Sequence, residues 1–343
     1  MGKLTIVILS ASWALMFCRA NAQTPGAIRQ VDSVQQRRQI EQTARAYEES
    51  GSAPELYPGE SSDLGPQSIL KFKPRKTYVE AMADAQYFYT DNMFLNEQGR
   101  QDADVLVSTA QISLAPTPHD LGGGKLAPRL GYRHQWYDFG LVSNTRLTVY
   151  DFQAQIFRVA SLNEFDFNAQ TIFADGRWKR ENWTIEAGFD FTRLMDTANY
   201  DQFYREFVPR WGVQRLFPLN ETGAISAGYE GDYRFADTDL PPPSFGRDFN
   251  SRTDHSLFLA YTHALSKHAV VQPFYRFQYT HFTAGENRDD CLNSFGLALH
   301  CFFTPHISVR AFVGYDIMTT SSNSAPGYNR LDAGGGANLN IRL

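Results

Sequence analysis

Residues 183–192 alternate between apolar and polar side chains, and this alternation constrains the fold more than any other stretch of the sequence. In Trp183–Thr192 the odd-numbered residues are apolar, and the even-numbered residues are polar except for Gly188. Because successive side chains of a strand point to opposite faces, one face would be apolar and the other charged. The same pattern recurs as far as Leu343. It predicts an all-β fold, a closed antiparallel transmembrane β-barrel with lipid outside and a polar lumen.

The composition agrees with a barrel and argues against two other classes of protein. The mean hydropathy of -0.39 excludes a helical membrane protein, whereas strands that are half polar permit this value. The formal net charge is -5 at pH 7, so nothing favours a nucleic-acid partner. Cys291 and Cys301 lie on one predicted strand, too far apart for a disulfide, and we expect free thiols.

The first 22 residues have the features of a secretory signal peptide. A lysine near the start is followed by an apolar run over residues 4–18 and by Ala-Asn-Ala at positions 20–22. Small residues at these positions suit signal cleavage, which would leave Gln23 as the first residue. Cys18 raises the alternative of a lipoprotein, but a phenylalanine precedes it where lipoprotein signals carry a small residue.

Residues 23–77 differ in composition from the rest of the chain, and we interpret them as a periplasmic N-terminal extension. The spacing within Val31–Ser50 predicts a short helix, and the three prolines within residues 51–66 predict an extended linker. A basic cluster then follows at Lys71, Lys73, Arg75 and Lys76. Two interpretations stay open: a solvated leader, or a segment that enters the barrel as a plug or docks on a periplasmic partner.

Residues 78–343 are predicted to form the barrel itself. The pattern gives about thirteen strands, whereas a bacterial barrel with both ends in the periplasm needs an even number, so we expect about 12–14. The least regular segment, Arg146–Phe157, is taken as the fourth strand. After Phe217 tight turns alternate with longer loops, which places the C-terminus in the periplasm.

Charged residues on the polar face of these strands are predicted to line the lumen. In the strand over residues 164–173 the phenylalanines are placed outward and the acids inward. The predicted lumen-lining set is Glu164, Asp166, Glu186, Asp190, Glu206, Arg210, Glu230, Asp232, Arg276, Arg310, Asp316, Asp332 and Arg342. In a water-filled lumen these charges stay hydrated and bias ion passage, whereas in a closed barrel they must pair across it. The sequence alone does not separate the two cases.

The search for catalytic or metal-binding residues gives no convincing set. His255 and Ser256 are neighbours on one strand and must point to opposite faces, and His300 lies about 20 Å along its strand from Ser294. The glycine triplet at 122–124 is not followed by the helix that a phosphate site requires. We therefore predict no enzymatic activity, no cofactor and no metal site.

One segment resembles a known group of proteins. The sequence Tyr-Phe-Tyr-Thr-Asp-Asn-Met-Phe-Leu at 87–95, followed by Asp102 and an apolar strand, resembles the opening strands of the β-barrel porin group of Gram-negative outer-membrane proteins. Those strands carry Tyr-x-Asp-Asn-x-Phe-Leu before an acidic residue. The match is confined to this segment, and Leu343 stands where many such proteins end in Phe. The resemblance implies a barrel in the cell outer membrane and a diffusion channel, and it brings no catalytic residues.

Together these observations predict a passive, porin-like channel for small hydrophilic solutes. The alternative is a non-conducting structural or export-associated barrel that docks periplasmic partners through residues 23–77, and a barrel hydrolase has less support. The partners implied are outer-membrane lipid, small hydrophilic solutes and a periplasmic protein, with no nucleic acid.

Overall fold

The computed structural model describes residues 19–51, 78–97, 100–143, 145–151, 156–239, 246–285, 287–322 and 327–343. The predicted signal peptide as far as Cys18, the proline-rich linker after Gly51 and the basic cluster before Tyr78 lie outside the described residues. No helix among the described residues is long and apolar enough to cross a membrane.

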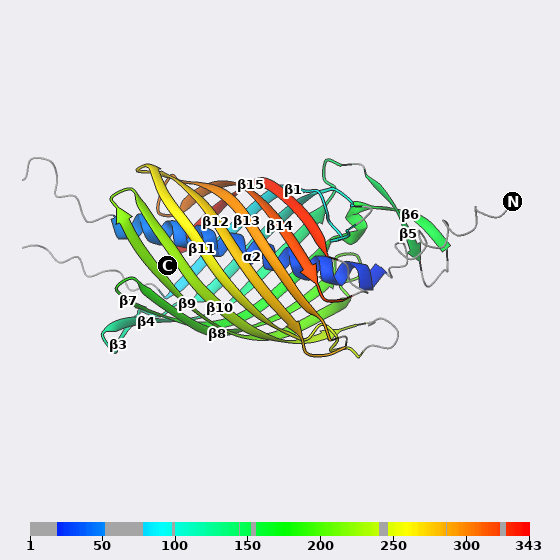
Figure 1. Cartoon of the computed structure of the whole chain (residues 1–343), viewed down its shortest axis with the longest axis horizontal. Coiled ribbons are helices and arrows are strands. Elements are labelled where there is room, and N and C mark those ends of the chain that lie inside the picture. The colour runs from blue at the N-terminus through cyan, green and yellow to red at the C-terminus, as the bar shows by residue number, and fades with distance from the viewer. Residues whose placement is uncertain are drawn as a thin grey trace, which may run out of the picture.

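Twelve strands in the described ranges form a closed antiparallel barrel (Figure 1). They are β1 (Val79–Thr90), β2 (Ala103–Leu114), β4 (Gly124–Phe139), β7 (Phe167–Arg180), β8 (Trp183–Asp196), β9 (Gln202–Asn220), β10 (Gly223–Thr238), β11 (Arg252–Ser266), β12 (Ala269–Phe282), β13 (Asp289–Phe302), β14 (Ile307–Thr320) and β15 (Tyr328–Arg342). Each strand pairs with its neighbours, and β1 pairs with β15 to close the sheet. The predicted fold class is therefore confirmed.

The outer face of the barrel carries the apolar residues of the alternating pattern. On β8, Trp183, Ile185 and Phe189 are all more than 40% exposed, while Asp190 and Thr192 on the opposite face are buried. This burial follows from the alternation of side chains along an extended strand. The exposed band is the surface that faces lipid.

The two ends of the barrel differ in the length of their connections. Turns at 181–182, 221–222, 267–268 and 303–306 join strands at one end, which we call the turn end. The connections at the other end, the loop end, are longer in most cases. In bacterial barrels the short turns are periplasmic and the long loops extracellular. The C-terminal strand finishes at the turn end, where the three-residue strand β3 (His119–Leu121) also pairs with β4.

The predicted fourth strand is not part of the barrel. Arg146–Phe157 instead contributes to a hairpin of β5 (Arg146–Asp151) and β6 (Ile156–Ser161). With the short 3-10 helix η1 (Leu162–Phe165), the hairpin belongs to the connection between β4 and β7 and projects from the loop end (Figure 1). Each strand has only six residues, and neither pairs with the barrel. This removes the odd strand from the predicted count.

A helix, α2 (Arg19–Gly51), lies inside the lumen (Figure 1). It is longer than the helix predicted over Val31–Ser50. Its first half lies at the loop end, where Ile28 packs in a cluster with Phe139 of β4. Its last part lies at the turn end, where Arg45 Nη1 donates to the carbonyl of Pro305 at 3.0 Å. Of the two interpretations of the extension, the helix follows the one in which the segment enters the barrel.

Candidate functional site

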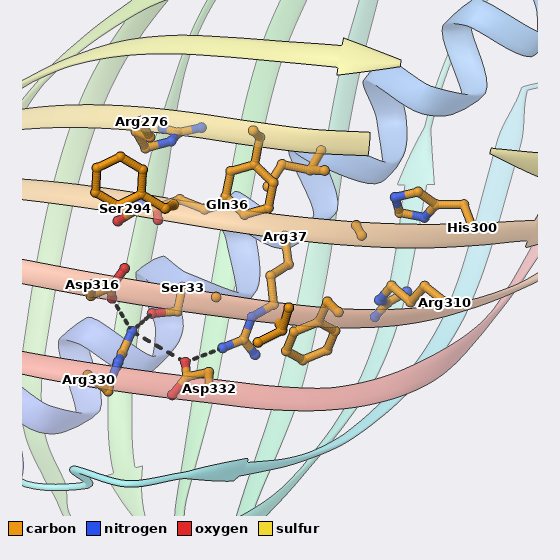
Figure 2. Close-up of a pocket in the computed structure, with 17 residues that line it drawn as sticks. Ser33, Gln36, Arg37, Arg276, Ser294, His300, Arg310, Asp316, Arg330 and Asp332 are labelled. Atoms are coloured by element: carbon orange, nitrogen blue, oxygen red, sulfur yellow. Dashed lines mark hydrogen bonds and ion pairs between the residues drawn. The ribbon is translucent and has the colours of Figure 1, made fainter. Parts of the chain in front are cut away.

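Ionic and polar contacts join α2 to the wall from Arg29 to Arg45. One network joins the helix to β14 and β15 (Figure 2). Arg37 Nη2 donates to Asp332 at 2.5 Å, and Arg29 lies 3.5 Å from Asp316. Arg330 bridges the two carboxylates, at 2.7 Å from Asp316 and 3.5 Å from Asp332. This network, which we call the first network, contains three arginines and two aspartates.

A second network follows closer to the turn end. The guanidinium of Arg310 on β14 lies 2.7 Å from Glu41 of the helix and 2.8 Å from Asp84 of β1. Arg38 and Arg45 of the helix approach the same two carboxylates, at 3.5 Å and 3.7 Å. Arg310 and Asp84 are almost fully buried, so each depends on these partners for its charge to be compensated.

A third network, on β9, β10 and β11, has an excess of acids. Asp32 of the helix lies 2.9 Å from Arg234 and 3.6 Å from Arg252. The same two arginines also approach three carboxylates of the wall, which are Glu206, Asp232 and Asp254. Four acids therefore share two arginines, and Asp32 adds to the negative charge already present in the wall.

The fourth network lies in the wall of β4, β7, β8 and β9 and pairs within itself. Arg210 contacts Asp175, Glu186 and Asp190. Arg129 bonds Asp175 at 2.8 Å, and Arg177 bonds Glu186 at 3.0 Å. Three arginines thus balance three acids, so this part of the wall does not need the charges of the helix.

A cavity of about 1340 Å³ separates α2 from the fourth network. It extends from Arg342 and Glu181 at the turn end to Glu206 and Asp254 deeper in the barrel. Charged and polar side chains of the wall line it on one side, and the helix residues from Asp32 to Arg45 line the other. Solutes of modest size would fit this space, which lies beside the helix and not in its place.

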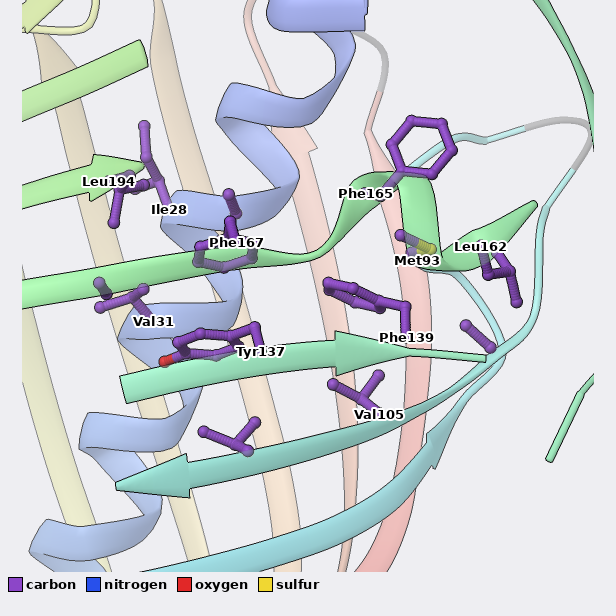
Figure 3. Close-up of a cluster of buried hydrophobic side chains, with 14 of the residues drawn as sticks. Ile28, Val31, Met93, Val105, Tyr137, Phe139, Leu162, Phe165, Phe167 and Leu194 are labelled. Carbon is purple, nitrogen blue, oxygen red and sulfur yellow. The ribbon is translucent and has the colours of Figure 1, made fainter. Parts of the chain in front are cut away.

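At the loop end the lumen is filled by apolar side chains (Figure 3). Ile28 and Val31 of the helix pack against the aromatic rings of β4 and β7. Tyr137 and Phe167 stack with their centroids 4.3 Å apart and their planes within 8°, and Phe139 packs beside Phe167. We call these five residues the outer seal. Leu147 and Ala160 of the projecting hairpin belong to the same buried cluster and cover it.

The prediction that Glu164 and Asp166 line the lumen is wrong. Glu164 lies in η1, where it pairs with Arg158 of the hairpin at 2.7 Å. Asp166 lies before β7, and its Oδ1 accepts the backbone N–H of Phe139 at 2.7 Å. The face of β7 is the reverse of the predicted one, since Phe167 is buried in the lumen and Ile172 is 51% exposed. The aromatic face turns inward because it packs against the apolar part of α2.

The other predicted residues all line either the large cavity or a smaller one between α2 and the strands β12 to β15. They are Glu186, Asp190, Glu206, Arg210, Glu230, Asp232, Arg276, Arg310, Asp316, Asp332 and Arg342. The predicted set lacks several lumen residues, which include Asp84, Arg129, Asp175, Arg177, Arg234, Arg252, Asp254 and Arg330 on the strands, and Arg29, Asp32, Arg37, Arg38, Glu41 and Arg45 on the helix. The alternation of side chains along the strands could have identified the strand residues. Nothing in the sequence alone could have placed the helix residues in the lumen.

His255 and Ser256 do not form a nucleophile–base pair. Nδ1 of His255 forms a hydrogen bond of 2.7 Å with the hydroxyl of Tyr229. Ser256 points to the opposite face of β11, where its Oγ accepts a hydrogen bond from Arg276 of β12. Cys291 and Cys301, both on β13, are free thiols as predicted. Within the described ranges no group of three or more His, Cys, Asp or Glu side chains is arranged to hold a metal ion.

A closed barrel with an even number of strands, an apolar outer face and a charged lumen defines the class of the protein as an outer-membrane β-barrel. Its place in the cell is therefore the outer membrane.

No protein-family model matches the chain, and no curated protein matches its sequence. Among solved structures, it is similar to the β-domain of the Bordetella autotransporter BrkA (TM-score 0.44, 12% identity, covering 78% of this chain and 100% of that one). It is also similar to the COG4313 outer-membrane channel of Pseudomonas putida F1 (0.47, 12%, 77% and 96%) and to the KdgM porin (0.37, 11%, 75% and 98%).

Proposed function

We propose that this protein is a diffusion channel for small hydrophilic solutes, and that α2 and the outer seal close the channel in the state that the structure describes. One observation carries the proposal: the large cavity beside the helix extends inward from the turn end and is lined largely by charges that pair with one another, while apolar side chains fill the lumen at the loop end. Charged linings bias ion passage, and hydrophobic constrictions gate channels by excluding water.

The polar surface of α2 favours the interpretation that the helix is a movable plug. Many of its wall contacts over residues 29–45 are ion pairs and hydrogen bonds, and they lie beside the apolar contacts of Val31, Val34, Ile40 and Ala44. The polar face of such a helix can enter water at little cost. Apolar packing of similar volume would close a permanent barrel at least as well as buried ion pairs do. Polar contacts therefore suit a helix that must sometimes leave its site.

A second function is favoured by a different observation. Three ionic networks and the outer seal hold α2 in the lumen, which suits a barrel that stays closed and acts as a structural or export-associated component. Such a barrel would use the chain after Gly51 to bind a periplasmic protein. The two functions make opposite predictions for conductance.

The test is single-channel recording in planar bilayers, comparing the purified, detergent-refolded chain from Gln23 with a variant that lacks residues 23–51. Folding of both is first checked by the shift in gel mobility on heating. We expect rare, brief openings from the complete chain, and stable, larger steps with weak cation preference from the deletion variant. Silence from a folded deletion variant would exclude the channel and favour the permanently closed barrel.

A further inference from the structure

A small cavity of about 50 Å³ lies between α2 and the strands β12 to β15 (Figure 2) and shares Gln36 and Arg276 with the lining of the large one. Four guanidinium groups and two carboxylates line the small cavity. Two of the four, Arg276 and Arg310, have acidic partners elsewhere, at Glu230 and at Glu41 with Asp84. The two that remain, Arg37 and Arg330, belong to the first network.

Charge does not balance in that network. Arg29, Arg37 and Arg330 carry three positive charges, whereas Asp316 and Asp332 carry two negative ones. Arg330 is only 2% exposed, so the extra charge is not hydrated by bulk water. An uncompensated charge in a buried site is costly, because the surroundings do not replace its hydration.

The same arginines also carry unused hydrogen-bond donors. Nη1 of Arg37, and both Nε and Nη1 of Arg330, are buried and have no hydrogen-bond partner among the described residues. The guanidinium of Arg37 is held in place between two rings, 4.2 Å from the centroid of Phe88 and 4.3 Å from that of Phe312. One oxygen of Asp332 is likewise unpartnered, so donors outnumber acceptors in this cavity.

We propose that this cavity binds one small monovalent inorganic anion of the size of chloride, between Arg37 and Arg330. The anion supplies the missing negative charge and accepts the free N–H groups, while a water beside it satisfies the free oxygen of Asp332. A space of 50 Å³ holds a chloride with one or two waters but excludes larger organic anions. Because Arg37 is on the helix and Arg330 on the wall, the anion fastens α2 to β15. The site does not depend on whether the barrel conducts.

The test compares thermal unfolding of the refolded complete chain in sodium chloride and in sodium gluconate at equal ionic strength and pH 7. A ligand that binds only the folded state raises the melting temperature in a saturable way. We expect a rise of about 3 °C or more with chloride and with bromide. Equal melting temperatures in the two salts would overturn the proposal.

Two variants and one control assign the effect to the site. Arg330→Met and Arg37→Met each remove one positive charge and balance the first network, so either variant that folds should lose the chloride response. Arg177→Met, in the network beside the large cavity, should retain it. Anomalous scattering from bromide-soaked crystals of the unaltered chain gives an independent readout: a peak between Arg37 and Arg330 supports the site, and no peak there contradicts it.

Discussion

At the scale of single residues, we expect closure of the barrel to depend most on the ring of Phe167 in the outer seal. It stacks on Tyr137 and also contacts Phe139 and Phe203. Replacing it by alanine removes aromatic packing worth about 3 kcal/mol and leaves a gap within the outer seal. We expect Phe167→Ala to give conducting openings in planar bilayers with α2 still present. Phe258→Ala, an equal truncation deeper in the lumen, should remain closed.

Asp166 makes the connection between β4 and β7 sensitive to pH. Burial of its carboxyl raises its pKa to about 7, although the N–H of Phe139 opposes this shift. The folded chain therefore holds a proton that the unfolded chain releases near pH 4, so the stabilisation is complete below that pH and is lost as pH rises through about 7.

Hydrogen exchange checks this expectation. Amides of the hairpin connection should exchange roughly tenfold more slowly at pH 5.5 than at pH 8, after correction for intrinsic rates. Asp166→Asn keeps an acceptor for the Phe139 N–H and should abolish the difference. An equal pH dependence in that variant would show that another group titrates.

At the scale of elements, the strands could be predicted and the position of the helix could not. The alternation along a strand identifies its lipid face because every second side chain contacts lipid and must be apolar. The same rule failed on β7, since its aromatic residues near Phe167 meet the apolar part of α2 and not lipid. The helix gives no such signal, because its polar residues would suit water as well as a charged lumen. The prediction of a barrel strand over Arg146–Phe157 failed for a related reason, because a short alternating segment also suits a hairpin within a loop.

The charge environment along α2 predicts that its two buried acids contribute unequally. Glu41 neutralises a network with an excess of arginines, whereas Asp32 enters one with an excess of acids. We expect Glu41→Gln to weaken the seating of the helix by about 1–3 kcal/mol, because Arg310 would keep only Asp84. Asp32→Asn should have a much smaller effect.

The rate at which trypsin cleaves after Arg37 and Arg38 reports this seating, since both sites lie inside the lumen. Cleavage should be faster in Glu41→Gln than in Asp32→Asn and in the unaltered chain. Equal rates in the two variants would show that charge balance does not hold the helix.

At the scale of the whole molecule, the direction of α2 sets which side of the membrane each end of the helix faces. Gly26 lies beside the carbonyl of Met93 in a connection at the loop end, and Arg45 lies beside Pro305 at the turn end. Because long loops are extracellular and short turns periplasmic, the start of the helix must be at the cell surface. The chain therefore runs through the barrel from outside to inside before its first strand begins.

Cysteine labelling in intact cells tests this direction. Pro25 and Gln42 are both exposed, the first near the loop end and the second facing the large cavity. In a background with Cys291 and Cys301 replaced by serine, a membrane-impermeant maleimide should label Pro25→Cys in intact cells. It should label Gln42→Cys only after the outer membrane is made permeable, since the outer seal separates that residue from the medium. Labelling of Gln42→Cys alone in intact cells would mean that the barrel has the opposite orientation.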